Sequence, residues 1–301
     1  MQSAPTLDAL FHKAVTALDT GDVRALADLL RAHPQLVRER LEAPGEWLRA
    51  QVGNALEDFF PRPYLLWFIA EDPVRNNTLP HNLVEIARTI IQTAQREAAH
   101  TLQEQLDYAL RLVAWSWVAR KCALQIALLD VLLEAGATLH ETITHDALVN
   151  GNFEAAAHLV RRGAKLTLAT ALCLEQWHEA EQLAQTLTTR DKQIALVLAA
   201  LHGKAEALTK LLVLGVDLNA YSTDIYTHAT ALHHAVSSGV LAAVQVLVAA
   251  GADLDMKDRA WNATPLEWAE HFRGEAQAEE TYEKYAAIAA YLRFAASGST
   301  P

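Results

Sequence analysis

The sequence has few cysteines, glycines and prolines, and each scarcity excludes a class of protein. The 301 residues include 2 cysteines, 12 glycines and 9 prolines. Two cysteines cannot build a disulfide framework in a chain of this length. Cys122 and Cys173 stand among apolar residues, so we expect both to be buried in helices, in a reducing compartment. The low glycine and proline content argues against an all-β protein, which needs frequent turns.

Long apolar runs and an excess of basic charge are also missing. The longest apolar runs, 65–70 and 194–201, fall far short of the roughly 20 residues that a membrane span needs. The net charge of −11 argues against nucleic-acid binding, because phosphates are neutralised by clustered lysine and arginine. The first residues do not have the pattern of a signal peptide. We therefore expect a cytoplasmic protein that binds neither nucleic acid nor a membrane.

What the sequence does contain is a repeated helical unit. A Gly-Ala-x-Leu-like string recurs and each copy follows an apolar stripe with helical spacing; its glycines are Gly136, Gly163, Gly215 and Gly251. Glycine suits this place because it adopts the left-handed conformation that commonly ends a helix. Tight turns lie between these stops, as at Gly151 and Gly203. The unit is therefore a helical hairpin, which buries its apolar faces by stacking on its neighbours.

The best copies resemble ankyrin repeats. The segment from Thr230 to Asp253 has a Thr-x-Leu-His start and a Gly-Ala-Asp stop, and Thr264-Pro-Leu-Glu-Trp-Ala opens another copy. The chain as a whole resembles divergent multi-repeat ankyrin proteins of bacteria. This resemblance implies an all-α, ankyrin-like solenoid and usually a protein-binding role. It also implies that His233 forms structural hydrogen bonds between adjacent loops.

The pattern predicts about eight helical hairpins in one solenoid domain over 1–297. The hairpins are expected near 6–33, 62–94, 103–136, 142–163, 167–188, 191–215, 230–251 and 264–296. Within the domain we distinguish divergent repeats (1–140), short compressed repeats (141–190), best-conforming repeats (191–272) and a C-terminal capping helix (273–297). The least regular stretch is 36–61.

Signatures of catalysis and of metal binding are missing. The sequence contains no phosphate-binding loop, dinucleotide fingerprint, serine-hydrolase elbow or zinc-protease motif. Two clusters contain histidine, namely His228, His233 and His234, and His140 with Glu141, His145 and Asp146. Neither cluster has two histidines at the i, i+4 spacing that places two zinc ligands on one helical face. We therefore predict no enzyme, no catalytic residue, no metal site and no cofactor.

The connectors before the two best helix starts carry the candidate binding residues. These are Tyr221, Tyr226, Arg259 and Trp261. Asp224 and Asp258 each stand six residues before the helix-starting threonine. The equal offset predicts that stacked repeats bring the four side chains together, partly exposed. Tyrosine, tryptophan and arginine dominate binding hot spots. We therefore expect a non-enzymatic protein-binding module, a scaffold or interaction protein, that uses these exposed connector tips and the concave helix face. The alternative is that Trp261 folds back onto the adjacent connector.

Charge suggests the kind of partner. Residues 216–301 hold 11 acidic and 5 basic side chains, which favours a basic protein or peptide. We expect the protein itself to be a monomer.

A second function remains open, namely an enzyme or small-ligand-binding protein with a pocket in the irregular region 36–120. Segments that break the local rules sometimes mark functional sites, and aromatic residues are concentrated between Trp47 and Phe68. A deep polar pocket would favour this alternative. A groove with exposed aromatic rings would favour the binding module.

Overall fold

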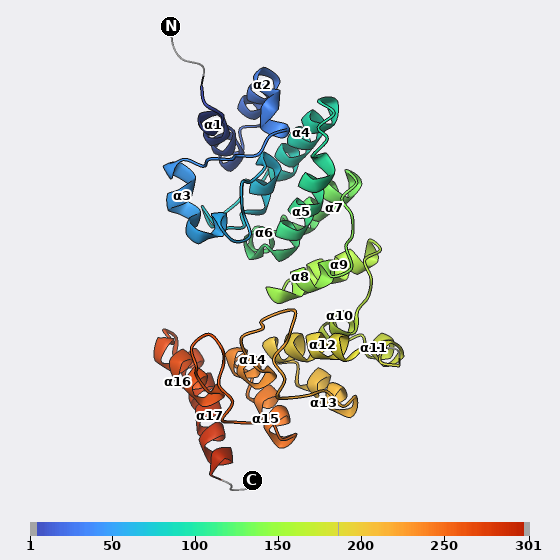
Figure 1. Cartoon of the computed structure of the whole chain (residues 1–301), viewed down its shortest axis with the longest axis vertical. Helices are drawn as coiled ribbons and strands as arrows, with labels where there is room; N and C mark the ends of the chain where they lie inside the picture. Colours follow the sequence, from blue (N-terminus) through green and yellow to red (C-terminus); the bar gives the residue numbers. More distant parts are fainter. Residues whose placement is uncertain (1–4, 186, 298–301) are drawn as a thin grey trace. The chain divides into compact units, whose positions relative to one another are not determined.

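The computed structural model describes residues 5–185 and 187–297, and within these ranges all regular structure is helical (Figure 1). The predicted all-α, ankyrin-like fold is confirmed: paired helices stack on their neighbours. The chain divides after Lys165 into two compact units. That residues 1–297 form one continuous solenoid stays a prediction. None of the described helices is both long and apolar enough to cross a membrane.

The first unit contains four helical pairs and an irregular segment. Its α-helices are α1 (Leu7–Asp19), α2 (Val23–Ala32), α3 (Glu46–Val52), α4 (Leu83–Arg96), α5 (Leu102–Trp115), α6 (Trp117–Lys121), α7 (Gln125–Glu134), α8 (Ile143–Val149) and α9 (Phe153–Arg161). Its 3-10 helices are η1 (Pro34–Val37), η2 (Gly53–Leu56) and η3 (Leu65–Ala70). The first helix of the second pair is thus the short η3, whose residues are all buried.

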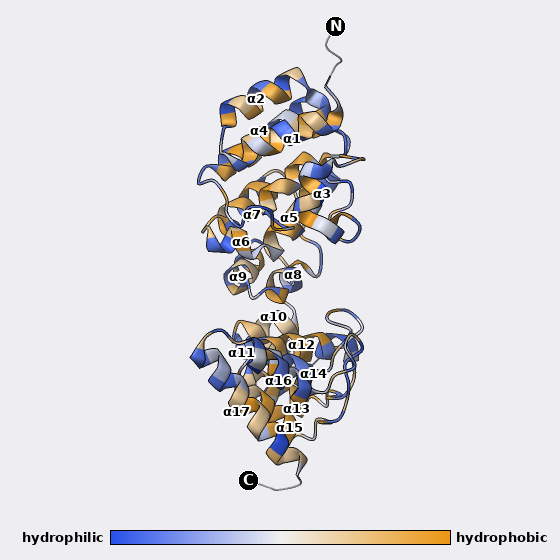
Figure 2. Cartoon of the chain, turned by 90° about the vertical axis from the view of Figure 1, so that its left-hand side faces the viewer, coloured by the Kyte–Doolittle hydropathy of each residue, from blue (hydrophilic) through white to orange (hydrophobic). Residues whose placement is uncertain are grey.

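The second unit contains the pairs that follow the repeat pattern best. Its helices are α10 (Leu168–Cys173), α11 (Trp177–Leu183), α12 (Thr189–Leu201), α13 (Ala205–Val213), α14 (Ala231–Ser237), α15 (Leu241–Ala249), α16 (Pro265–Glu275) and α17 (Glu279–Ala296). The helices mix hydrophobic and hydrophilic residues, as stacked amphipathic pairs must (Figure 2).

The glycine stops act as the sequence predicts. Gly136, Gly163, Gly215 and Gly251 have φ values of 105°, 103°, 69° and 90°, in the left-handed region. Each follows the last turn of its helix and reverses the chain without a Cβ clash.

Helix α17 covers the end of the second unit. It lies beside α16 (Figure 1) and also contacts α15. Its Ile288, Ala289 and Leu292 are buried, whereas Glu279, Glu283 and other charged side chains are exposed. This distribution is what a terminal cap requires.

The aromatic residues of the irregular segment fill a core. Phe60, Tyr64, Trp67 and Phe68 are at most 3% exposed. Their rings contact one another, with 5.3 Å between the centroids of Phe60 and Phe68 and the same distance between Tyr64 and Trp67. These side chains therefore stabilise the irregular backbone around them, and the alternative of a pocket in 36–120 is not favoured.

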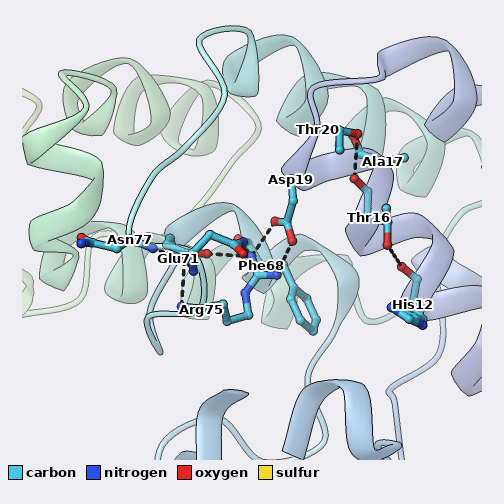
Figure 3. A network of polar contacts seen from close by, with 10 residues as sticks. His12, Thr16, Ala17, Asp19, Thr20, Phe68, Glu71, Arg75 and Asn77 are labelled. Atoms are coloured by element: carbon cyan, nitrogen blue, oxygen red, sulfur yellow. Dashed lines mark hydrogen bonds and ion pairs between the residues drawn. The ribbon is translucent and has the colours of Figure 1, made fainter. Parts of the chain in front are cut away.

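A buried ion pair fixes the loop that follows η3 (Figure 3). The side chains of Glu71 and Arg75 are 0% and 2% exposed and lie 2.8 Å apart. Arg75 also forms two hydrogen bonds with Asp19 of α1, each 2.9 Å long. Glu71 Oε1 accepts hydrogen bonds from the backbone N–H groups of Arg75, Asn76 and Asn77. The loop is thus joined to the first helical pair by paired buried charges.

The two cysteines differ in burial. Cys173 is buried in α10, as predicted, and its burial raises the thiol pKa to about 12. Cys122 comes just after the last turn of α6 and is partly exposed, so the prediction of a buried helix residue was wrong for it. Helix α6 has only five residues and ends at Lys121, so Cys122 stands at its C-cap and not within the helix.

Candidate functional site

The second unit contains an apolar groove of about 590 Å³ between the connectors and helices of its last repeats. We call it the C-terminal groove. Its walls come from the end of α12, from the connectors before α14 and α16, and from these two helices. The lining residues are Leu201, Tyr226, His228, His234, Ser237, Trp261, Ala263, Glu267, Trp268, His271 and Phe272.

The second connector owes its shape to Asp258. This side chain is buried, and its Oδ1 accepts hydrogen bonds from the backbone N–H groups of Ala260 and Trp261, at 2.7 and 2.6 Å. Its Oδ2 accepts from the N–H of Ala263 and from the indole N–H of Trp268, at 3.0 and 2.9 Å. Burial alone would raise the pKa of Asp258, but these donors outweigh it and lower the pKa. An ionised Asp258 therefore fixes the loop that presents Trp261.

The first connector is built in the same way, but two residues earlier relative to its helix. Ser222 Oγ accepts hydrogen bonds from the backbone N–H groups of Asp224 and Ile225, two and three residues later. Asp258 accepts from the residues at the same two positions of the second connector. The left-handed residue of the first connector is Tyr226, with φ 47°, and that of the second is Asn262, with φ 55°. The expected equivalence of Asp224 with Asp258 was therefore wrong by two residues.

Hydrogen bonds join the two connectors despite this shift. His233 Nε2 lies 3.0 Å from the carbonyl oxygen of Ala263, and its Nδ1 lies 2.8 Å from the hydroxyl of Thr230. Because a carbonyl only accepts, Nε2 carries the proton and Nδ1 accepts from the hydroxyl. The backbone N–H of Arg259 donates to the carbonyl of His228 at 2.6 Å. The predicted structural role of His233 is confirmed.

The four predicted binding residues form two neighbouring pairs. Tyr226 and Trp261 line the C-terminal groove. Tyr221 and Arg259 lie outside its lining, where the guanidinium carbon of Arg259 stands 3.9 Å from the centroid of the Tyr221 ring. The Tyr221 hydroxyl donates to the carbonyl of Lys257 at 2.5 Å. Both pairs sit on the joined connectors, although only one of them faces the groove.

Trp261 both contacts the adjacent connector and is exposed, so it agrees with each of the two interpretations of its sequence. Its ring contacts His228 of the adjacent connector at a centroid distance of 5.7 Å. It is nevertheless 69% exposed. The indole is thus held in place at one edge and leaves most of its surface available.

Sequence reasoning missed the side chains of the groove floor, His234 and Trp268. They are 2% and 8% exposed, and their ring centroids lie 6.3 Å apart. The signal that could have found them is positional: each stands four residues after a helix-starting threonine, Thr230 or Thr264. Residues at equal positions in stacked repeats become neighbours. Equal offsets from the threonine therefore identify neighbouring residues in α14 and α16, because both helices begin at a threonine cap.

Burial controls the protonation of the floor. Desolvation, followed by the charges of His228 and His233, lowers the pKa of His234 to about 4, against a weaker opposing effect from a hydrogen bond with the backbone of Tyr226. Its Nε2 is buried and has no hydrogen-bond partner among the described residues. At neutral pH His234 is therefore a neutral ring with an unpaired acceptor.

The groove carries one carboxylate, that of Glu267. The backbone N–H of Thr264 donates to Glu267 Oε2 at 2.6 Å and lowers the carboxyl pKa, so the exposed side chain is ionised at neutral pH. Glu267 and His271, which are four residues apart on α16, both line the groove. Within residues 5–185 and 187–297, no group of three or more His, Cys, Asp or Glu is placed to hold a metal ion.

A comparison with protein families agrees with the repeat pattern over part of the chain. Residues 169–258 match the family model described as "Ankyrin repeats (3 copies)". A solved structure of the human ASB11 ankyrin repeat domain is 17% identical to this chain, with a TM-score of 0.38. The match covers 91% of this chain and 96% of the ASB11 chain. The ankyrin repeat domain of Bcl-3, described as a unique member of the IkappaB protein family, is 19% identical, with a TM-score of 0.35, and covers 90% and 96%.

At these TM-scores neither neighbour bears on the function. No curated protein matches the sequence. The matched residues 169–258 include the pairs α10–α11, α12–α13 and α14–α15, and end at Asp258. Residues 169–258 are therefore similar to ankyrin repeats.

Proposed function

We propose that the protein is a non-catalytic module that binds a protein or peptide segment in the C-terminal groove. The observation that carries this proposal is Trp261, an indole 69% exposed beside an apolar groove. A partner can bury this large exposed ring at little entropic cost, because the side chain has only two torsions and already contacts His228. Ankyrin repeats are generally protein-interaction modules, which supports the proposal.

The connectors extend the proposed contact surface beyond the groove. Tyr221 and Arg259 already stack on each other, so their side chains are pre-ordered for contact with a bound segment. Tyr226 is half-buried against His234, at a ring distance of 5.3 Å, and would contribute mainly its exposed edge. Helices α14 and α16 would provide the base under that segment through Ser237 and the apolar ring of Phe272.

We place the protein in the cytoplasm and treat it as a monomer in this proposal. Both cysteines are free thiols, as a reducing compartment would keep them. Sedimentation of the purified chain tests the monomer directly.

The proposed function is tested by quantitative capture with the full-length chain. Trp261→Ala should lower the recovery of the specific partner by roughly thirty-fold, the loss expected of a hot-spot residue. Trp117→Ala is the matched control, because Trp117 is also an exposed tryptophan (40%) but lies in the first unit. Adding Tyr226→Ala to Trp261→Ala should complete the loss.

Thermal melting keeps the outcome interpretable. Trp261→Ala should melt close to wild type because the side chain is mostly exposed. Equal recovery of the same proteins by both single variants would refute the proposal. A large drop in melting temperature for Trp261→Ala would show that the ring is structural.

A further inference from the structure

We infer that the C-terminal groove binds the cationic side chain of a lysine or arginine within a basic peptide segment. The inference rests on the proposed function and adds the chemistry of the occupant. It follows from the kinds of side chain that the groove brings together: aromatic rings, one carboxylate and a neutral histidine with a free acceptor.

The aromatic rings are arranged around the groove at mutual contact distances. Trp268 stands at the centre, with centroid distances of 5.7 Å to Trp261 and 6.1 Å to Phe272. Tyr226 completes the lining from the first connector. Aromatic faces carry negative electrostatic potential, and a cation within about 6 Å of a ring centroid is attracted, most strongly by tryptophan.

The formal charge of the groove has the same sign. Glu267 is its only carboxylate, and the lining includes neither lysine nor arginine. Hydrogen bonding from Thr264 keeps Glu267 ionised and in place at the first turn of α16. A cation in the groove would therefore have a fixed counter-charge, whereas an anionic ligand would be repelled.

The floor adds a further acceptor. His234 Nε2 is buried without a hydrogen-bond partner among the residues described. An unpaired acceptor in an apolar site is costly, and its lone pair makes the local potential more negative. His234 is neutral at physiological pH and so does not oppose a cation.

The basic side chains of the second connector, Lys257 and Arg259, are not among the residues that line the groove. Arg259 lies over the ring of Tyr221. Hydrogen bonds with Thr264 and, more weakly, the charge of Lys257 lower the pKa of Glu267. The connector that presents Trp261 thus adds no basic side chain to the lining itself.

The test uses fluorine NMR of the full-length chain labelled with 5-fluorotryptophan, with the Trp261 signal assigned through Trp261→Phe. The probes are N-acetyl methylamides of lysine, arginine and norleucine, the last being a neutral analogue of lysine with the same number of side-chain carbons. The two cationic probes should shift the Trp261 and Trp268 signals saturably. The norleucine probe should bind at least about ten-fold more weakly, since it lacks the cation–π attraction and the counter-charge.

The charge is tested by Glu267→Gln, which keeps the helix cap because glutamine also serves in a capping box. This variant should weaken the cationic probes by roughly three- to ten-fold and leave the norleucine probe unchanged. Glu275→Gln is the matched control, because it removes the same charge from α16 at an exposed position outside the groove. It should change the affinity of the cationic probes by less than about two-fold.

Equal affinity for the lysine and norleucine probes, or no effect of Glu267→Gln, would overturn the inference. If Trp261→Ala still abolished capture of a protein in that case, the proposed function would stand and only the basic occupant would be lost. If the cationic probes bound as expected but Trp261→Ala left capture intact, the protein-binding proposal would fall and the cation preference of the groove would stand.

Discussion

The ring of Trp261 meets the ring of His228 edge-on, at an angle of 87°, across two connectors that belong to successive repeats. The contact exists because the His233 side chain and the Arg259 backbone N–H join those connectors through hydrogen bonds to backbone carbonyls. A shared backbone frame thus places side chains that lie far apart in the sequence on one groove. The same frame explains why Trp261 can be ordered without being buried.

The glycines of the hairpins differ in what surrounds them, and this predicts a ranking. Gly251→Ala should cost about 1 kcal/mol of unfolding free energy, because its φ of 90° is strained for alanine although no atom lies within 4 Å of the added Cβ. Gly203→Ala should cost more, because its Cβ would stand 2.4 Å from Val240 Cγ2 in addition to a φ of 60°. Urea unfolding measures both, and equal costs would show that conformation alone matters at these turns.

The repeat register is tested by Leu247, which is fully buried in α15. Leu247→Ala should lower the free energy of unfolding by roughly 2–5 kcal/mol, because the lost side chain leaves a cavity between stacked helices. Val213→Ala is the control: Val213 is 86% exposed at the end of α13, and its change should stay within about 0.5 kcal/mol. Similar losses for both variants in urea titrations would contradict the assigned register.

Periodicity and glycine placement were enough to predict the helical pairs, because each depends on residues close together in the sequence. Gly251 shows this, since its left-handed conformation follows from the apolar stripe that it ends. The shape of the connectors was harder to predict, because it depends on which side chain accepts the turn hydrogen bonds. In the first connector this acceptor is Ser222, although the spacing of Asp224 from its helix matches that of Asp258.

The groove itself could be predicted only in part. Tyr226 and Trp261 were found because exposed rings on connectors are unusual. His234 and Trp268 were missed because they look like core residues in the sequence, and they are indeed nearly buried. Only the register of α14 against α16 shows that these core residues form the floor of an open site.

The buried pair of Glu71 and Arg75 predicts that replacing Arg75 alone destabilises the protein more than replacing both residues. Arg75→Met should destabilise the protein by about 3–5 kcal/mol, because it leaves the Glu71 carboxylate buried without its counter-charge. Combining it with Glu71→Gln should recover part of that loss, because glutamine can still accept the backbone N–H groups of the loop through its amide oxygen.

A surface ion pair is the control for this experiment. Arg31→Met breaks the exposed contact of Arg31 with Asp28, whose side chains are 74% and 59% exposed, and should cost less than about 1 kcal/mol. If Arg75→Met were as mild as Arg31→Met in urea unfolding, the loop after η3 would not depend on its buried charges.

The lowered pKa of His234 predicts a dependence of stability on pH with a definite sign. The unfolded chain binds a proton at this histidine near pH 6.5, whereas the folded protein does so only near pH 4. Between these values the unfolded state holds more protons, so the His234 contribution is fully present above about pH 6.5 and is lost as the pH falls towards 4. The loss should reach about 3 kcal/mol at most. Asp72 acts in the opposite direction, because burial and the charge of Glu71 raise its pKa to about 6, and its contribution is lost as the pH rises.

The two effects are separated by comparing wild type with His234→Leu. Urea unfolding of the full chain, followed through the fluorine signal of Trp268 beside His234, should show the acid loss in wild type and a weaker one in the variant. Asp72 is common to both proteins and cancels in the difference between them. If the difference in unfolding free energy stayed constant from pH 7 to about 4, His234 would titrate equally in the folded and unfolded states. The desolvation of the His234 ring at the groove floor would then be ruled out.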